Sequence, residues 1–580
     1  MTARVPLPAG SAPNRLSSPA FSAEACLLAV VAVYIVLVAL LPLARLFWTA
    51  LSPDESGAVF GALARQWRSA SAARALRHTL ETGAWSVLVS MAIGTAAALL
   101  IVLSDVRAKT MATFAVMLPM LIPAQITALA WVEMLAPSGP LQVFAKLAGG
   151  TLAGSNPLYS GRGIALVLGV EHAPLVFLAV RAGLARLPRD MIESARLAGA
   201  SPARVLRSVI LPALAPALLG GGTMAFIASI ANFGTPAILG IPGRYPMLTT
   251  LIYQRLQGFG PGALGQVASL ALILALLAVA GLALRALLAR KAHARLDAAG
   301  APFAGFELGA WRGTASAVLW LVLALIAVLP LLALVGVSLS PAIGVPLSLH
   351  TATLDAYRQV IGNDTVRRAF VNSALLAGGA AFGCVAVSLP LAYLAAVRRL
   401  RAARVLDLVA DLSYAVPGTV LALGVILILL RPLPLVGVSL YGTLGILGFA
   451  YLARFLALAL RPVMAGAEQF DRSLDEAGQA AGAGLWRRLV FIVLPAVAPS
   501  AVAAALLVFM AAFNELTVSA LLWSTGNETV GVAVFLYQYE GDAAAASALA
   551  SLSLALTLGL AAAVLLLRRY LPEGVLRWRA

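Results

Sequence analysis

Charged residues are scarce in this chain. Only 11% of its 580 residues are Asp, Glu, Lys or Arg, whereas 61% are hydrophobic, and the mean hydropathy is +0.95. A soluble protein of this length needs a charged surface around its core, and this sequence has too few charges to cover one. The composition therefore excludes a soluble globular protein and predicts an all-α integral membrane protein whose outer surface faces the lipid bilayer.

Cysteine and lysine are nearly absent as well. The two cysteines, Cys26 and Cys384, lie inside apolar runs, which excludes a disulfide framework and argues against a metal site. None of the three lysines has the Gly-x-x-x-x-Gly-Lys-Ser/Thr context of a phosphate-binding loop. Histidine, cysteine and carboxylate residues do not cluster at ligand spacing. We therefore expect neither an enzyme nor a cofactor bound by this chain.

The formal net charge of +17 has a particular placement. The basic residues stand in short clusters between apolar runs, at 107–109, 290–295, 398–404 and 568–579. This placement follows the positive-inside pattern of membrane proteins and argues against nucleic acid as a partner. With both termini cytoplasmic, all four clusters fall on one side. The loop 48–78 carries four further arginines against the pattern, and we interpret it as an amphipathic periplasmic segment.

Twelve apolar runs are long enough to span a bilayer, which takes about 20 residues. They lie at 25–47, 79–103, 110–135, 163–183, 213–240, 264–290, 313–339, 371–396, 405–430, 443–464, 496–523 and 545–567. We expect a disordered cytoplasmic tail at 1–24, a six-helix half at 25–290, a cytoplasmic linker at 291–312, a second six-helix half at 313–570 and a cytoplasmic tail at 571–580.

The two halves contain an internal repeat. Residues 189–216 align with 472–499 at a constant offset of 283, and Glu, Gly and Pro recur at matching positions. The Glu-to-Gly spacing is six residues and the Gly-to-Pro spacing is thirteen in both copies. Leu121-Ile122-Pro123-Ala124 likewise matches Ala415-Val416-Pro417-Gly418 at an offset of 294. The repeat therefore predicts that the two halves are copies of one duplicated unit with the same topology.

Each repeated segment predicts a short polar helix at the membrane surface. Gly199 and Gly482 supply a tight bend, and Pro212 and Pro495 suit the first turn of the next spanning helix. The short helix would expose its glutamate to a groove on a partner. The alternative is an ordinary amphipathic loop helix, repeated only because the gene was duplicated.

The repeated segments resemble the signature of permeases in binding-protein-dependent ABC importers, which is Glu-Ala-Ala, three residues, Gly and a later Pro. This chain has Glu193-Ser194-Ala195 with Gly199, and Glu476-Ala477-Gly478 with Gly482, each departing at one small residue. The resemblance implies the type I ABC importer fold with two tandem six-helix repeats in the bacterial inner membrane. It also implies coupling helices at 189–212 and 472–495. The residues concerned are Glu193, Ala195, Gly199, Ala200, Pro212, Glu476, Ala477, Gly482, Ala483 and Pro495.

The same resemblance implies partners. Two copies of a cytoplasmic ABC ATPase would dock on the two coupling helices and carry the Mg-ATP, and a periplasmic substrate-binding protein would deliver the cargo. A six-plus-six secondary transporter driven by an ion gradient is the competing class, and it has no need of the doubled Glu-Gly-Pro segment.

Ionisable and amide side chains inside the spans are candidates for function, because such groups are costly in lipid. Asn232 and Glu515 occupy equivalent positions, 283 residues apart. One interpretation is that they line the translocation path together with Thr235, Asn514 and Thr517; the other is hydrogen bonding between helices without cargo contact. For Glu171, His172 and Arg454 we favour structural pairing.

Two stretches resemble the ferric-iron branch of the permease family, which fuses both halves in one chain. They are Phe233-Gly234-Thr235-Pro236-Ala237-Ile238-Leu239-Gly240 and Asn514-Glu515-Leu516-Thr517 with the later 522–529 segment. The resemblance implies Fe(III) as cargo. Permeases for thiamine, 2-aminoethylphosphonate, polyamines, or sulfate and molybdate have similar architecture and remain alternatives.

Overall fold

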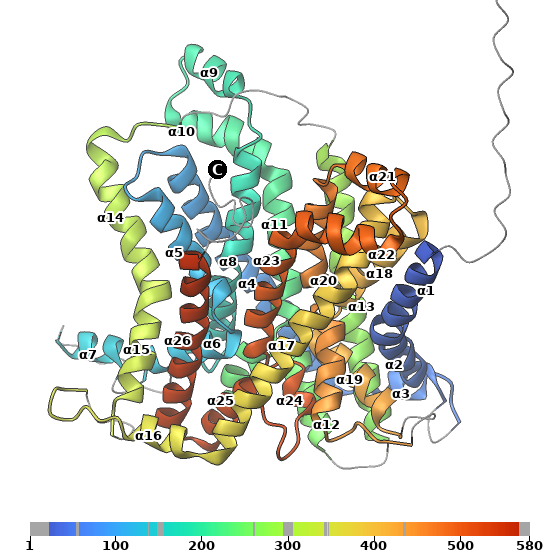
Figure 1. Cartoon of the computed structure of the whole chain (residues 1–580). Helices are drawn as coiled ribbons and strands as arrows, with labels where there is room; N and C mark the ends of the chain where they lie inside the picture. The colour runs from blue at the N-terminus through green and yellow to red at the C-terminus, as the bar shows by residue number, and fades with distance from the viewer. Residues whose placement is uncertain are drawn as a thin grey trace, which may run out of the picture.

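The computed structural model describes residues 23–567 except 54–56, 137–138, 148–155, 259–261, 294–304, 342–344, 346 and 433–436. Residues 1–22 of the tail expected at 1–24, the tail expected at 571–580 and the middle of the linker lie outside the described residues, whereas residues 23–24 belong to the first helix. Helices account for most of the described chain, and they stand side by side in one bundle (Figure 1).

Ten of the twelve predicted runs are continuous helices that are long and apolar enough to cross a membrane, counted over the described residues. Many begin before the apolar run does, because polar residues extend the helix beyond the lipid. The spans are α1–η1–α2 (Ala23–Leu51), α4 (Ala70–Leu103), α8 (Gly161–Leu184), α10–η2–α11 (Pro202–Ala231), α13 (Ala263–His293), η4–α14–η5–α15 (Gly309–Ser338), α17–η6 (Asp364–Val397), α20 (Leu444–Glu468), α22–η7–α23 (Leu485–Phe513) and α26 (Ala543–Leu567).

The other two runs, 110–135 and 405–430, are not single helices. Each is broken before a proline into α5 (Lys109–Leu121) and α6 (Ala124–Met134), and into α18 (Arg401–Ala415) and α19 (Gly418–Leu429). The residue before each proline, Ile122 or Val416, is extended, because the proline ring disfavours helical backbone there. The axes of α5 and α6 meet at 103°.

The fifth helix of each half lies about ten residues earlier than the sequence predicts. It ends at Ala231 or Phe513, so the second parts of the runs 213–240 and 496–523 fold back as separate short pieces. The shift arises because Pro212 and Pro495 do not start a helix. Each follows a π turn, η2 (Leu206–Ile210) or η7 (Leu489–Val493), inside a continuous span. The wider turn accommodates a residue that has no N–H for the i−4 carbonyl.

The first span of each half packs against the other half. α2 (Leu41–Leu51) lies along α19, and α1 (Ala23–Ile35) contacts α17 and α18. Reciprocally, α15 (Leu329–Ser338) packs on α6, and α14 (Arg312–Leu323) on α5. The order of the helices in the sequence does not predict this exchange of first spans between the halves. The exchange holds the two halves together through buried apolar surface.

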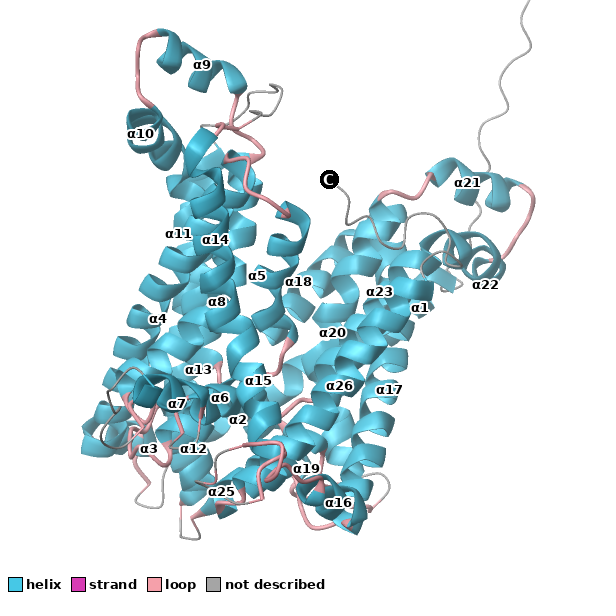
Figure 2. Ribbon diagram, turned by 90° about the vertical axis from the view of Figure 1, so that its left-hand side faces the viewer, coloured by secondary structure: helices cyan, strands magenta, loops and turns pink. Residues whose placement is uncertain are grey.

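The short helices gather at the two ends of the bundle. α9 (Arg189–Leu197) and α21 (Arg472–Ala480) protrude from the same end of the bundle, apart from each other, and we call this end the coupling face (Figure 2). The beginning of α1 and the end of α26 lie toward this face (Figure 1). The opposite face carries α3 (Gly61–Arg68), α7 (Pro140–Leu147), α12 (Leu248–Gln257), α16 (Asp355–Gly362), α24 (Ser519–Leu522) and α25 (Val530–Glu540).

Candidate functional site: the coupling helices and the polar junctions

The coupling helices α9 and α21 end in the same backbone motif. Gly199 and Gly482 have φ of 81° and 80°, a left-handed conformation that glycine adopts without penalty. In α9 the N–H groups of Gly199 and Ala200 donate to the carbonyls of Arg196 and Ala195. Gly482 and Ala483 do the same with Gln479 and Gly478. This is a Schellman cap, and its left-handed residue explains the glycine at each of these positions.

The outward sides of the coupling helices combine apolar and acidic groups. Met191 and Leu474, which are equivalent in the repeat, are 41% and 51% exposed. The glutamates differ: Glu193 pairs with Arg189 one turn earlier, whereas Glu476 has no ion-pair partner among the described residues. Arg472 instead donates to the Ala396 carbonyl at 2.7 Å. An apolar side chain and a carboxylate on an exposed helix suit a groove on another protein.

The inward sides of the coupling helices differ in chemistry. Ile192 and Val205 are fully buried and belong to an apolar cluster at the end of the first half. At the equivalent positions of the second half, Asp475 and Arg488 are also buried, and their side chains pair at 2.8 Å. One coupling helix is therefore seated by apolar packing and the other by an ion pair.

The segment from Phe306 to Leu308, which we call the strap, joins α9 to the start of the second half. The Phe306 N–H donates to the Leu103 carbonyl at 2.7 Å, and the Arg196 guanidinium of α9 lies 5.9 Å from the Phe306 ring centre. The N–H of Leu308 donates to Asp105, which holds the pKa of that carboxyl below its usual range. Arg312 lies 3.4 Å from the same carboxylate.

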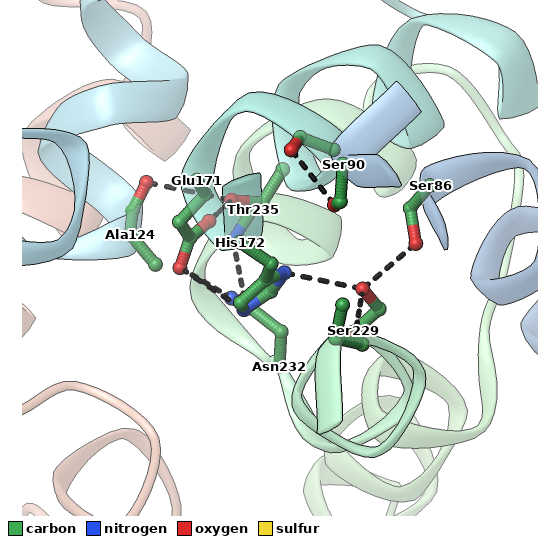
Figure 3. A network of polar contacts seen from close by, with 10 residues as sticks. Ser86, Ser90, Ala124, Glu171, His172, Ser229, Asn232 and Thr235 are labelled. Atoms are coloured by element: carbon green, nitrogen blue, oxygen red, sulfur yellow. Dashed lines mark hydrogen bonds and ion pairs between the residues drawn. The ribbon is translucent and has the colours of Figure 1, made fainter. Parts of the chain in front are cut away.

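The predicted polar residues of the first half meet in the membrane region (Figure 3). Glu171, on α8, accepts hydrogen bonds from Asn232 Nδ2 at 2.8 Å and from Thr235 Oγ1 at 3.1 Å. Asn232 is the residue at which the fifth helix ends, and its Oδ1 accepts from the Thr235 N–H. The amide therefore caps the broken backbone while it neighbours the carboxylate. The side chains of Asn232 and Thr235 therefore both bond to the Glu171 carboxylate.

His172 lies beside this group. Its Nδ1 is 3.1 Å from the Ser229 hydroxyl, which accepts from Ser86 at 2.7 Å (Figure 3). Its Nε2 lies 3.8 Å from Glu171. These contacts join α4, α8 and α11 (Leu211–Ala231), the packing role that the sequence favours for this histidine.

The second half places different groups at the same positions. Glu515 corresponds to Asn232, and its carboxylate accepts from the N–H of Val518 at 2.8 Å and from the N–H and hydroxyl of Ser519 at 3.0 and 2.9 Å. Arg454 corresponds to Glu171; it lies within electrostatic range of Glu515 and donates to the Val416 carbonyl at 3.1 Å. That carbonyl precedes Pro417, at the break between α18 and α19.

The two junctions are joined across the halves. Gln125, at the start of α6, donates to the Asn514 carbonyl at 2.8 Å. The Asn514 side chain bonds to Thr557 and Ser553 of α26. Thr517 packs against α19 so closely that a Cβ on Gly418 would lie 2.9 Å from its Cγ2 atom.

Sequence reasoning missed three residues. Gln125 is one ordinary amide beside Pro123, and nothing in its neighbours signals the contact with Asn514. Asp475 and Arg488 could have been found, because the repeat aligns this charged pair with the apolar pair Ile192 and Val205.

Two pseudo-equivalent sets of spans, with a capped surface helix from each on one face, define a two-part membrane permease. The chain belongs to the family described as binding-protein-dependent transport system inner membrane component, whose model matches residues 69–294 and 388–572. Permeases of this family work in general with ATPase and substrate-binding protein partners. Membership of this family therefore argues against the alternative of a secondary transporter driven by an ion gradient. The family and the apolar spans make the chain a multi-pass inner membrane protein.

Individual relatives are similar over parts of the chain. A probable ABC transporter permease protein of Sinorhizobium fredii is 31% identical over 62% of this chain and 63% of its own length. A putative ferric transport system permease protein of Haemophilus influenzae is 25% identical over 79% of this chain and 71% of its own. A putative 2-aminoethylphosphonate transport system permease protein of Salmonella typhimurium is 35% identical over only 15% of this chain and 30% of its own.

Proposed function

We propose that this chain forms the translocation pathway of an ATP-driven importer for ferric iron. Two copies of an ABC ATPase dock on α9 and α21, and both the coupling face and the two termini are cytoplasmic. A periplasmic substrate-binding protein delivers the cargo to the opposite face. The chain itself binds no cofactor, and Mg-ATP is held by the ATPase subunits.

One observation carries the docking part of this proposal. The coupling helices protrude on the same face, end in the same Schellman cap and each present an exposed apolar side chain beside a glutamate. A pair of identical partner subunits needs two such matching surfaces. The matching residues are Glu193, Gly199, Ala200 and Pro212 in the first half and Glu476, Gly482, Ala483 and Pro495 in the second, and Ala195 and Ala477 belong to the same segments at positions that are not equivalent.

Transport follows from two states of the halves. ATP draws the ATPase subunits together, the coupling helices move with them, and the halves rock so that the pathway opens alternately to each side. Asn232, Thr235, Asn514, Glu515 and Thr517 stand at the junctions where helices five and eleven break, and we place the moving boundary of the pathway there. Their polar groups exchange partners when the junctions separate.

Ferric iron is the proposed cargo because a putative ferric transport system permease protein is similar over 79% of this chain. Among the described residues, no three His, Cys, Asp or Glu side chains gather as a metal site, so the binding protein would set most of the selectivity. The short match to a 2-aminoethylphosphonate permease makes that compound the second candidate, ahead of thiamine, polyamines, sulfate and molybdate.

Radiolabelled uptake tests the cargo. Cells that contain this chain with its ATPase and binding protein should take up Fe(III) and lose that uptake when the ATPase is removed. Collapse of the proton gradient with ATP held constant should leave uptake intact. Uptake of 2-aminoethylphosphonate without iron would replace the cargo and leave the importer in place. Uptake of iron that persists without the ATPase would contradict the importer itself.

A further inference from the structure

The buried ion pair beneath α21 is part of a larger network. Arg488, on α22 (Leu485–Arg488), lies 2.8 Å from Asp475, and its Nη1 donates to the Tyr393 hydroxyl at 3.1 Å. The Tyr393 hydroxyl also lies 3.2 Å from the Asp475 carboxylate. Arg398, from the loop after α17–η6, lies 3.8 Å from the same carboxylate. Three elements of the second half therefore meet at one aspartate.

The network also reaches the beginning of the chain. Glu24, in the first turn of α1, lies 2.9 Å from Arg398 and 3.6 Å from Arg488. Two carboxylates thus balance two guanidiniums, with only Glu24 and Arg398 partly exposed. Glu24 is 451 residues from Asp475 in sequence, yet the same two arginines join them.

Seating a coupling helix does not require these charges. The first half holds α9 with Ile192 and Val205 at the equivalent positions, and both are fully buried. A buried ion pair also contributes little net stability, because the desolvation of the two charges offsets their attraction. Apolar residues of similar volume often stabilise a fold equally well. The charges therefore need an explanation other than holding the helix in place.

The span that begins at Glu24 supplies that explanation. α1–η1–α2 runs without a break from the coupling face to the opposite face, ending at Leu51. Along its length it packs on α17, α18, α20 and α19 and then on α13 of the first half. A movement of α21 that pulls on Glu24 would therefore reach both halves at the far face.

We propose that Asp475 and Arg488 are positioning residues that link the second coupling helix to α1. Through Arg398 and Glu24 they transmit the ATP-driven movement of α21 to the span Ala23–Leu51, whereas α9 meets the start of the second half through the contact of Arg196 with the Phe306 ring and not through a buried ion pair among the described residues. This inference rests on the proposed function, since it assumes that the ATPase moves α21. A physical pathway requires demonstrated coupling rather than proximity, so the test measures movement.

The chain itself offers the decisive variant. Asp475→Ile with Arg488→Val installs the residues of the first half, so that the seat of α21 stays packed while the link to Glu24 is removed. Asp407→Ile with Arg461→Val is the control, because it removes a 2.8 Å ion pair between α18 and α20 that includes no residue of α1 or α21, together with the pairing of Arg461 with Asp411. Melting temperature and ATPase co-purification report the fold and docking of each variant.

Movement is read at the opposite face. Spin labels at Trp48→Cys and Arg162→Cys, in a Cys26→Ser background, report the distance between the far ends of α2 and α8 in the complete complex. ATP should change this distance in the parent and in the control pair. In Asp475→Ile/Arg488→Val, with melting temperature and ATPase binding retained, we expect at least half of the change to be lost.

The outcomes separate the possible roles. A full ATP-dependent change of the spin-label distance in Asp475→Ile/Arg488→Val would overturn the proposed link. The ion pair would then have a structural role only. Loss of the change in the control pair as well would also overturn it, because any ion pair would then suffice. Failure of the parent complex to bind the ATPase would instead count against the proposed function.

Discussion

The two halves of this permease share their backbone landmarks and differ in the chemistry beneath them. Gly199 and Gly482 close identical caps, and the π turns η2 and η7 begin 283 residues apart. The inward residues have nevertheless diverged from Ile192 and Val205 to Asp475 and Arg488. The shape of each coupling helix is therefore fixed more tightly than the way it is seated.

The same contrast holds inside the membrane. Glu171 and Asn232 of the first half are replaced by Arg454 and Glu515, so the carboxylate has moved from the fourth helix to the fifth. At the neighbouring contact, Ala124 meets Gly234, whereas Gly418 meets Thr517. At each break, polar side chains bond between neighbouring helices, and one small residue lets two backbone segments approach closely. The carboxylate and the glycine each stand on different segments in the two halves. Glu193 and Glu476, by contrast, are identical in the two halves and lie on the outward sides of α9 and α21.

The largest difference between the halves should appear at the seats of the coupling helices. Asp475→Asn leaves the buried Arg488 guanidinium and the partly exposed Arg398 guanidinium with one carboxylate fewer, and we expect a loss of about 3 kcal/mol in the free energy of unfolding. Ile192→Val, at the equivalent position, should cost about 1 kcal/mol. Thermal unfolding of the purified permease measures both. Equal losses would show that the two seats do not differ as described.

The membrane carboxylates should also separate. Glu515→Gln deprives a buried N–H of its acceptor at the Val518 or Ser519 position, at a cost of about 2 kcal/mol. Glu171→Gln should cost less than about 1 kcal/mol, because the Thr235 hydroxyl can rotate to accept from the new amide. The same unfolding assay compares them, and a larger loss at Glu171 would contradict this account of the bridges.

The close contact offers a compensation test. Gly418→Ala places a Cβ atom against the Thr517 methyl and should cost about 1–2 kcal/mol. Thr517→Ser removes that methyl, so the double variant should recover most of the loss. Unfolding of the two single variants and the double variant gives the coupling energy, and strict additivity would argue against the contact.

The smallest effect is expected at the strap of the first half. Phe306→Leu keeps the apolar bulk but removes the ring beneath Arg196, which should cost about 0.5 kcal/mol at this exposed site. Protease accessibility of the 294–304 segment, compared between the variant and the parent, gives a sensitive measure. A loss as large as that of Asp475→Asn would make the strap a principal support of α9.

Much of the fold could be predicted from the sequence, because apolar runs and the repeat carry strong signals. The caps at Gly199 and Gly482 were expected from the spacing of Glu, Gly and Pro. The breaks at Pro123 and Pro417 were not, since the apolar runs continue through them. The prediction that Pro212 and Pro495 lie in the first turn of a spanning helix was wrong, because each proline follows a π turn inside a longer continuous helix.

The candidate site could be predicted only in part. Asn232, Thr235 and Glu171 were each singled out, yet their mutual bonding depends on where the fifth helix ends, which hydropathy does not reveal. The exchange of the first spans between halves, and with it the contact of Glu24 with Arg398, requires the tertiary structure. Roles at the coupling helices stay predictions until docking is measured.

Co-purification of the ATPase with Glu193→Arg, Glu476→Arg and the double variant tests the central claim most directly. Membrane insertion of each variant and its melting temperature serve as controls. We predict that each single reversal weakens ATPase binding and that the double reversal abolishes it, with insertion unchanged. Normal co-purification with the double variant would contradict the assignment of α9 and α21 as the docking elements.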